Sequence, residues 1–252
     1  MSSSVSSGTP TEMDAVTVPQ QPIEANAEVL SVEWLFEPFW PGIRLLARRS
    51  GGRVHLTDAA GDDIEHAPEL RGAGDVLAAS VLAADAVVDG IWTAQPFIRD
   101  RSPDRAWAET LAAGEREADA ARDAPRGSAD DDAPRRAFVA VDLVEIDGQP
   151  LGEVPFQERR RLLESVIEVG VHVRLSPIVK QPLAGWLVAW RANGFTHYVA
   201  KHMNSRYRPG QRIDPGRGNE EWLKLSLRTR APRGFFTSML GGRGDRVRRI
   251  SD

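Results

Sequence analysis

Short apolar runs separated by tight turns form the first regular pattern along the chain. Leu35 and the runs 43–47 and 54–57 are separated by Pro41-Gly42 and by Ser50-Gly51-Gly52. Apolar runs of this length between turn residues are typical of strands, and turns this short join antiparallel neighbours. The pattern therefore predicts antiparallel strands in this part of the chain.

Helical spacing alternates with strand-like runs farther along. Apolar residues recur with a helical period in 68–84 and in the strongly amphipathic segment 155–169, and a third helix is predicted at 183–193, ended by Gly194. Strands are predicted at 86–90, 138–144, 171–177, 198–201 and 222–227. Helices and strands mixed in this order, with hairpin-type turns, predict an α+β domain.

Three segments lack such a pattern. Residues 1–28 are polar and read as a disordered leader, and 100–136 read as a charged surface insertion. The last segment, 228–252, is an arginine-rich tail in which we expect no further folded domain. The folded domain is therefore expected to span 29–227.

Composition excludes several classes of protein. The 252 residues contain no cysteine, so disulfides and thiolate chemistry are excluded, and no apolar run approaches the length of a membrane helix. The N-terminus lacks the pattern of a signal peptide, so we expect a cytoplasmic protein without a membrane partner. His55, His66, His197 and His202 lack the spacing of a metal site, and no metal site is predicted.

The most informative motif is the run from Glu37 to Leu45, which reads Glu-Pro-Phe-Trp-Pro-Gly-Ile-Arg-Leu. It resembles the nucleotide-attachment motif of the ATP-dependent DNA ligases, Glu-Pro-Lys-aromatic-Asp-Gly-aliphatic-Arg. In that family the lysine amine attacks the α-phosphate of ATP to form lysyl-AMP. Phe39 stands at the lysine position and Pro41 at the aspartate position. A phenyl ring has no lone pair with which to attack phosphorus, so no catalytic residue is predicted here.

Five further motifs resemble the same family in the same order. Val88-Asp89-Gly90-Ile91 is similar to the family's Leu-Asp-Gly-Glu. The strand 138–143 is similar to its Phe-aliphatic-Ala-Phe-Asp-Leu strand, and the helix 151–164 is similar to its Pro-Leu-x-x-Arg-Arg-x-x-Leu helix. Gly194 to Lys201, continued by Ser205 to Gly210, resembles Gly-Phe-Glu-Gly-aliphatic-Val-Ala-Lys followed by Ser-x-Tyr-x-Pro-Gly. Trp222 to Ser226 resembles Trp-Leu-Lys-aliphatic-Lys.

The resemblance implies the fold and the ancestral site. It implies an ATP-grasp-like nucleotidyltransferase domain, the ligase adenylation domain, with antiparallel sheets flanked by helices. The family uses ATP and Mg²⁺, and it closes on DNA with an OB-fold domain, for which 228–252 is too short. By resemblance, the vestigial nucleotide-binding positions are Glu37, Arg44, Asp89, Phe138, Lys201 and Lys224.

The substitutions remove the chemistry that these positions would serve. By resemblance, Ile91 replaces a glutamate that serves the ribose or the metal, Thr196 replaces a metal-associated glutamate, and Ser226 replaces a phosphate lysine. Without these carboxylates Mg²⁺ has few oxygen ligands, and the charge on an α-phosphate is poorly offset. We therefore expect no bound cofactor. Phe39 and Trp40 beside Ile91 predict a pocket filled by apolar side chains, either collapsed for stability or reshaped for another ligand.

The retained polar residues also have structural interpretations. Arg44 follows a turn and is equally consistent with an exposed strand end, and Asp89 before Gly90 is typical of a turn. Lys201 and Lys224 are consistent with residual phosphate contacts or with the wall of a former cleft.

The arginine-rich tail supplies the candidate nucleic-acid contacts. It contains seven arginines and only two acidic residues. Such a segment can bind phosphate backbones with an affinity that depends on salt. It could instead solubilise the chain or pair with the acidic segment 115–132. The candidates are Arg228, Arg230, Arg233, Arg243, Arg246, Arg248 and Arg249.

Three functions stay open at this level. The first is a catalytically inactive ligase-like protein with an accessory role in DNA repair, with DNA and an intact ligase or another repair protein as partners. The second is a scaffold for protein contacts built on a ligase shell. The third is an active nucleotidyltransferase in which Lys201 or Lys224 replaces the missing nucleophile.

Overall fold

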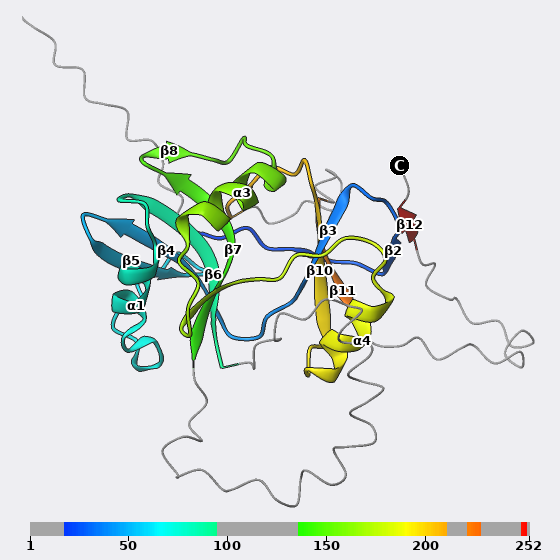
Figure 1. Cartoon of the computed structure of the whole chain (residues 1–252), viewed down its shortest axis with the longest axis horizontal. Helices are drawn as coiled ribbons and strands as arrows, with labels where there is room; N and C mark the ends of the chain where they lie inside the picture. The colour runs from blue at the N-terminus through cyan, green and yellow to red at the C-terminus, as the bar shows by residue number, and fades with distance from the viewer. Residues whose placement is uncertain (1–17, 95–135, 211–220, 228–247, 251–252) are drawn as a thin grey trace, which may run out of the picture.

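The two larger of three sheets lie side by side in the computed structural model, with helices packed against them (Figure 1). The structure describes residues 18–94, 136–210, 221–227 and 248–250. The larger sheet has the order β5-β4-β6-β7-β8, and β9 pairs with β7 from the side. Its strands are β4 (Ile43–Ser50), β5 (Arg53–Asp58), β6 (Ala86–Thr93), β7 (Ala137–Ile146), β8 (Gln149–Pro150) and β9 (Val173–Leu175).

The smaller sheet has the order β1-β11-β10-β3. Its strands are β1 (Ile23–Glu24), β3 (Trp34–Pro38), β10 (His197–His202) and β11 (Trp222–Ser226). Most neighbours in the two sheets are antiparallel, whereas β1 pairs with β11 in parallel and β9 pairs with β7 in parallel. The expected α+β class with antiparallel sheets and flanking helices is confirmed.

The helices follow the predicted segments with shorter bounds. They are η1 (Pro68–Leu70), α1 (Ala73–Ser80), α3 (Phe156–Val166) and α4 (Ala184–Ala192). The single helix expected at 68–84 is divided, because Gly72 has a left-handed backbone with φ of 80° between η1 and α1. After α1 the chain is extended, and Val81 forms a bridge with Ile167 instead of continuing the helix.

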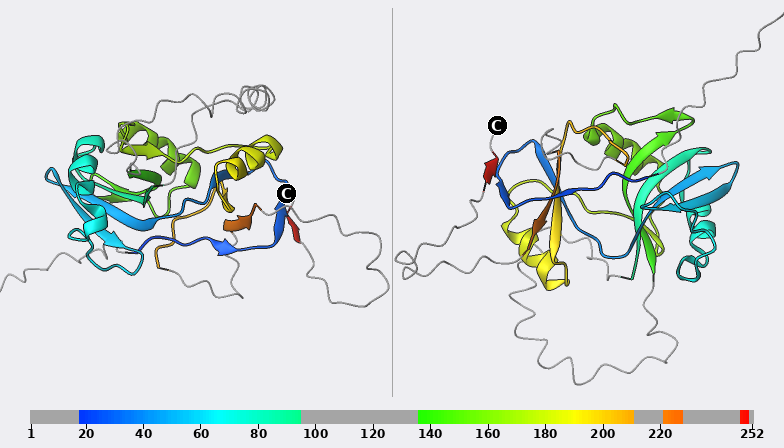
Figure 2. Two further views of the ribbon diagram at one scale, coloured as in Figure 1. Left: turned by 90° about the horizontal axis from the view of Figure 1, so that it is seen from below. Right: turned by 180° about the vertical axis from the view of Figure 1, so that it is seen from behind.

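The alternation of side chains along β6 and β7 divides the core between the two sheets. Trp92 and Phe138 pack with α1 on one face of the larger sheet, whereas Ile91 and Val139 pack toward the smaller sheet and α4. Successive residues of a strand point to opposite faces, so adjacent positions serve different clusters. The two views of Figure 2 show α1 and α4 at opposite ends of the molecule.

A buried ion pair fixes α3 against β7. Arg159 donates to both carboxylate oxygens of Asp142, at 2.9 and 2.8 Å, and also to the carbonyl oxygen of Ser205 at 3.0 Å. Both side chains are fully buried. Removing one partner of such a pair leaves an uncompensated buried charge, which is why both residues constrain the helix position.

The boundaries of the folded part differ from those expected. Residues 18–28, placed in the leader, contain β1 and the start of β2 (Ala27–Val29), because their backbone pairs with β11 and with β12 (Arg248–Ile250). Arg248 and Arg249, placed in the tail, therefore have backbone positions in a strand. The rest of the leader, the insertion apart from Arg136, and Arg228, Arg230, Arg233, Arg243 and Arg246 lie outside the described residues.

None of the described helices is long and apolar enough to cross a membrane.

Candidate functional site

A small pocket lies where the nucleotide-attachment motif leaves β3 and enters β4. Its volume is about 130 Å³. The lining residues come from the N-terminal segment, from the motif and from the strands beside it: Gln21, Glu37, Pro38, Phe39, Trp40, Pro41, Gly42, Arg44, Ile91, Val141 and Val199. The five motif positions from Glu37 to Pro41 therefore surround one cavity.

Glu37 and Lys201 form a buried ion pair beside this pocket. Lys201 Nζ lies 2.6 Å from Glu37 Oε1 and donates to the carbonyl oxygen of Val141 at 3.2 Å. The same ammonium lies 4.0 Å from the ring centroid of Trp222 and 4.7 Å from that of Phe156. Burial lowers the pKa of Lys201, although the Glu37 carboxylate opposes this shift. Lys201 is thus held in the core and does not line the pocket.

Arg44 is held by Asp89 on the neighbouring strand. Arg44 Nε and Nη2 donate to the two Asp89 oxygens at 2.6 and 2.7 Å, and the Tyr207 hydroxyl donates to Asp89 Oδ2 at 2.8 Å. The N-terminal segment closes this group, because the Gln20 amide donates to the Tyr207 hydroxyl at 3.1 Å. Asp89 is therefore a partner of Arg44 and Tyr207 and not a residue of an open turn.

Electrostatics keep this group of side chains charged as an ion pair. Burial of the Arg44 guanidinium disfavours its charged form, but the attraction and hydrogen bonds of Asp89 outweigh burial and raise the pKa of Arg44. Burial raises the pKa of Asp89, and its two hydrogen bonds from Arg44 offset part of that shift. We treat the pair as ionised, because both carboxylate oxygens accept from the guanidinium. Burial raises the pKa of Tyr207 well above its usual value, and Asp89 adds to the shift.

Phe39, at the position of the family nucleophile, is half-buried at the mouth of the pocket. Its backbone amide donates to the carbonyl oxygen of His197 at 3.0 Å, which extends the pairing of β3 with β10. Lys224 Nζ lies 4.4 Å from the Phe39 ring centroid and 3.1 Å from Glu24 Oε1. Lys224 is therefore engaged by a ring and by a carboxylate of β1.

The apolar filling expected from the sequence is partial. Trp40 and Ile91 are buried, and Trp40 Nε1 donates to Ser176 Oγ at 2.9 Å while its ring packs edge-on against Phe195. Phe39 remains half-exposed, and the pocket of about 130 Å³ stays open beside it. Glu37 Oε2 is buried near this space without a hydrogen-bond partner among the described residues.

Phe138 belongs to the core and not to the pocket. Its side chain is fully buried, and its ring fills the space beside Gly90, where an added Cβ would lie 2.2 Å from Phe138 Cζ. Of the vestigial nucleotide positions, the structure therefore brings Glu37 and Arg44 to the pocket wall, with Asp89 and Lys201 behind them. Lys224 lies over Phe39 at the mouth.

One histidine lies closer to carboxylates than the sequence spacing indicated. His55 on β5, Asp63 and Glu65 offer ligand atoms that all lie within 4.8 Å of one another. All three side chains are exposed, and none lines the pocket at Phe39. The three residues therefore form a surface cluster separate from the pocket at Phe39. Exposed acidic groups of this kind are common without a metal ion.

Sequence reasoning missed the residues that immobilise the site. Gln20 lies in the segment expected to be a disordered leader, and Tyr207 lies in the Ser-x-Tyr-x-Pro-Gly motif. Gln20 donates to the Tyr207 hydroxyl and accepts from Arg44, and Tyr207 donates to Asp89. The available signal was the Ser-x-Tyr-x-Pro-Gly pattern itself, which carries Tyr207. Nothing in the composition of residues 18–24 marks Gln20, because its contacts are made by its backbone and by one amide oxygen.

Comparison with known proteins places these observations in a family context. No family model matches the sequence. The chain is 27% identical over 191 residues to the multifunctional non-homologous end joining protein LigD of Mycobacterium bovis, covering 75% of this chain and 22% of the relative. It is 32% identical over 88 residues to a DNA ligase of Thermococcus onnurineus, covering 33% of this chain and 15% of that ligase. The chain thus spans about a fifth of the length of the LigD relatives.

A solved structure shows the same fold. The mycobacterial DNA ligase D complexed with ATP and MES superposes with a TM-score of 0.51 and 25% identity. The match covers 81% of this chain and 58% of that structure.

Proposed function

Because this chain is homologous to the LigD ligases and has the fold of an ATP-dependent DNA ligase adenylation domain, we propose that it is a ligase-like protein that forms no lysyl-AMP. We further propose that it acts as an accessory factor in DNA repair or recombination. The observation that carries the proposal is the side chain at the nucleophile position, Phe39, which has no nucleophilic atom.

The two lysines considered as replacements for the nucleophile have other partners. Lys201 is 2% exposed, is paired with Glu37 and lies against the faces of Trp222 and Phe156. A lowered pKa favours a neutral amine, but a nucleophile must also reach the phosphorus atom, and Lys201 is enclosed by protein. Lys224 is paired with Glu24 above the Phe39 ring. These contacts favour an inactive protein over the alternative in which a displaced lysine attacks ATP.

The residues at the pocket do not fit Mg²⁺ and ATP. Pockets for ligands of this size have volumes of roughly 300–1,000 Å³, whereas this one measures about 130 Å³. The carboxylate of Asp89 is occupied by Arg44 and Tyr207, and the unpartnered oxygen of Glu37 would repel a phosphate. Ile91 and Thr196 offer no carboxylate to a metal ion.

The test of inactivity is direct. The full chain is incubated with ATP and Mg²⁺ and examined by intact mass, with a mycobacterial LigD as the positive control. We expect an AMP adduct on the control and none on this chain, and we expect no sealing of a nicked duplex. An adduct mapped to any lysine of this chain would overturn the proposal.

Nucleotide binding is tested separately from chemistry. A ligand that binds only the native state raises its stability, so binding of ATP would raise the melting temperature. We expect no shift with millimolar ATP. A clear shift that persists in Arg44→Gln would locate ATP elsewhere, and one that disappears in that variant would show a reshaped pocket at Phe39.

The accessory role needs a test in cells. Deleting the gene should increase sensitivity to DNA double-strand breaks, and the wild-type gene and Phe39→Ala should rescue equally, because the proposed role uses no chemistry at that position. A deletion strain with unchanged sensitivity would favour the alternative of a scaffold for protein contacts outside repair.

A further inference from the structure

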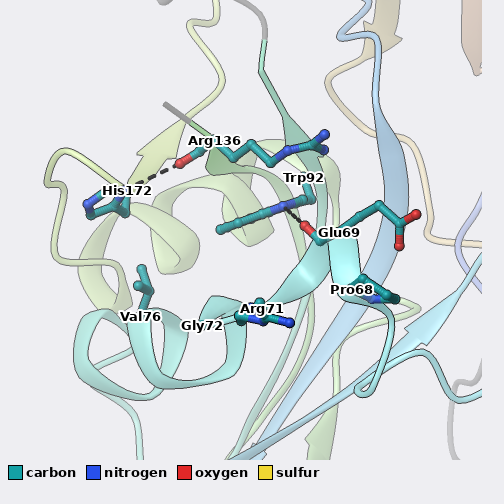
Figure 3. A pocket seen from close by; sticks show the side chains of 8 residues that line it. All are labelled: Pro68, Glu69, Arg71, Gly72, Val76, Trp92, Arg136 and His172. Carbon is teal, nitrogen blue, oxygen red and sulfur yellow. Dashed lines mark hydrogen bonds between the residues drawn. The ribbon is translucent and has the colours of Figure 1, made fainter. Parts of the chain in front are cut away.

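A second and larger pocket lies on the outer face of the six-stranded sheet (Figure 3). Its volume is about 550 Å³, within the roughly 300–1,000 Å³ typical of ligand pockets. Its lining comes from η1, from the start of α1, from the end of β6 and from the segments that precede β7 and β9: Pro68, Glu69, Arg71, Gly72, Val76, Trp92, Arg136 and His172.

This pocket is separate from the one at Phe39. Ile91 lines the pocket at Phe39 and Trp92 lines the second pocket, and these neighbours on β6 point to opposite faces of the sheet. The two linings share no residue. Ligand binding in the second pocket is therefore independent of the proposed function. Each of the two proposals can be wrong without affecting the other.

Three basic side chains gather at this pocket. Arg71, Arg136 and His172 are exposed, and neither guanidinium has an ion-pair partner among the described residues. Several other described arginines pair with carboxylates, as Arg44 does with Asp89 and Arg159 with Asp142. Within the part of the chain that the structure describes, the two guanidiniums therefore leave positive charge in one cavity without a paired carboxylate.

The hydrogen bond of His172 fixes its tautomer. His172 Nδ1 lies 3.3 Å from the carbonyl oxygen of Arg136, which can only accept, so Nδ1 carries the hydrogen atom. Among the described residues no partner is found for Nε2. The backbone therefore orients the ring. Nε2 accepts a hydrogen bond when the ring is neutral, so a phosphate oxygen would be bound by the imidazolium form, in which both nitrogens donate.

The floor and one edge of the pocket are fixed by backbone contacts. Trp92 Nε1 donates to the carbonyl oxygen of Glu69 at 2.8 Å, so the buried indole forms an apolar wall (Figure 3). Gly72 is the N-cap of α1 and has no side chain to accept from the amides of the first turn. The start of a helix favours an anion, which adds to the charge of the arginines. In the view of Figure 3, Arg136 and Arg71 lie on either side of Trp92.

We propose that this pocket binds a phosphate-bearing ligand through Arg71, Arg136 and His172. Guanidinium groups form charge-assisted hydrogen bonds with phosphate oxygens, and the cavity is large enough for a phosphorylated small molecule or the phosphorylated end of a nucleic-acid strand. Among the described lining residues Glu69 is the one carboxylate, and it disfavours a ligand that would fill the whole cavity with negative charge.

The test measures binding of inorganic pyrophosphate to the full chain by calorimetry at low salt. The double variant Arg71→Gln/Arg136→Gln should weaken binding at least about tenfold, because each charge-assisted hydrogen bond is among the strong ones. Arg53→Gln/Arg191→Gln is the matched control, since it removes two exposed arginines from other elements at the same total charge. This control should bind like the wild type.

Two further arms separate the sources of the phosphate. Tighter binding of a 5′-phosphorylated oligonucleotide than of its 5′-hydroxyl counterpart, lost in the double variant, assigns the pocket to a strand end. Equal binding of the two oligonucleotides, with pyrophosphate binding still lost in the double variant, assigns it to a small phosphorylated molecule. Absence of pyrophosphate binding to the wild type, or an equal loss in the control, would overturn the proposal.

Discussion

Lys201 Nζ lies 2.6 Å from Glu37 Oε1, and the two side chains are only 2% and 4% exposed. In the family that the sequence resembles, both positions serve the nucleotide. Here they satisfy each other inside the protein, with two aromatic rings over the ammonium. A buried pair of this kind contributes to the stability of the domain, and that contribution can be measured.

We expect Lys201→Met to lower the free energy of unfolding by about 3–5 kcal/mol, because it leaves the Glu37 carboxylate buried without its partner. The double variant Lys201→Met/Glu37→Gln should regain most of this loss, since it removes both charges. Denaturant unfolding followed by circular dichroism measures both. A single variant as stable as the wild type would mean that the pair is open to solvent.

Restoring the lysine by Phe39→Lys should not restore AMP transfer. Pro41, Ile91, Thr196 and Ser226 would still lack the groups that support the nucleophile, and residues that act as a unit do not recover singly. Intact mass after incubation with ATP and Mg²⁺ checks this. An adduct on the new lysine would show that the supporting shell is still sufficient.

The two tyrosines of the chain should ionise late. Burial raises the pKa of both Tyr207 and Tyr198, and neighbouring carboxylates add to each shift. Unfolded phenols ionise at about pH 10, so their protons are lost first from the unfolded state. The stabilising contribution is therefore fully present below pH 10 and is lost as the pH rises above it.

Phenolate absorbance measures this prediction. The native protein should show little phenolate at pH 10, whereas the denatured protein should be about half ionised. Tyr207→Phe should remove the larger part of the loss of stability at high pH. Full burial beside Asp89 raises the pKa of Tyr207 well above its usual value, whereas Tyr198 is less buried. Titration of both phenols at pH 10 in protein shown to be folded would contradict it.

The arginine-rich tail should bind nucleic acid weakly and without sequence preference. Replacing its seven arginines by glutamine should abolish gel-shift binding, and the wild-type affinity should fall by orders of magnitude between low and physiological salt. Substitution is preferable to truncation, because β12 pairs with β2 and its removal exposes a strand edge. Binding that ignores salt would indicate another surface.

The sequence by itself determined the order and type of most elements from β3 to β11, but not β1, β2, β8 or β12. Short apolar runs bounded by turn residues marked β4, β5 and β6, and helical spacing marked α3. These patterns depend only on neighbours in the chain. The motif order likewise indicated the ligase fold, and the residue at position 39 excluded a lysine nucleophile there. All of this information lies in local sequence patterns and in the order of the motifs.

Only the tertiary structure decided how the remaining polar residues are used. Burial of Lys201 against Glu37, capture of Arg44 by Asp89 and Tyr207, and the entry of Gln20 into that group join residues that are far apart in the chain. The same is true of Arg71, Arg136 and His172, which share one pocket although their segments are widely separated. Burial and charge pairing depend on distances in space, and no spacing along a single chain encodes them.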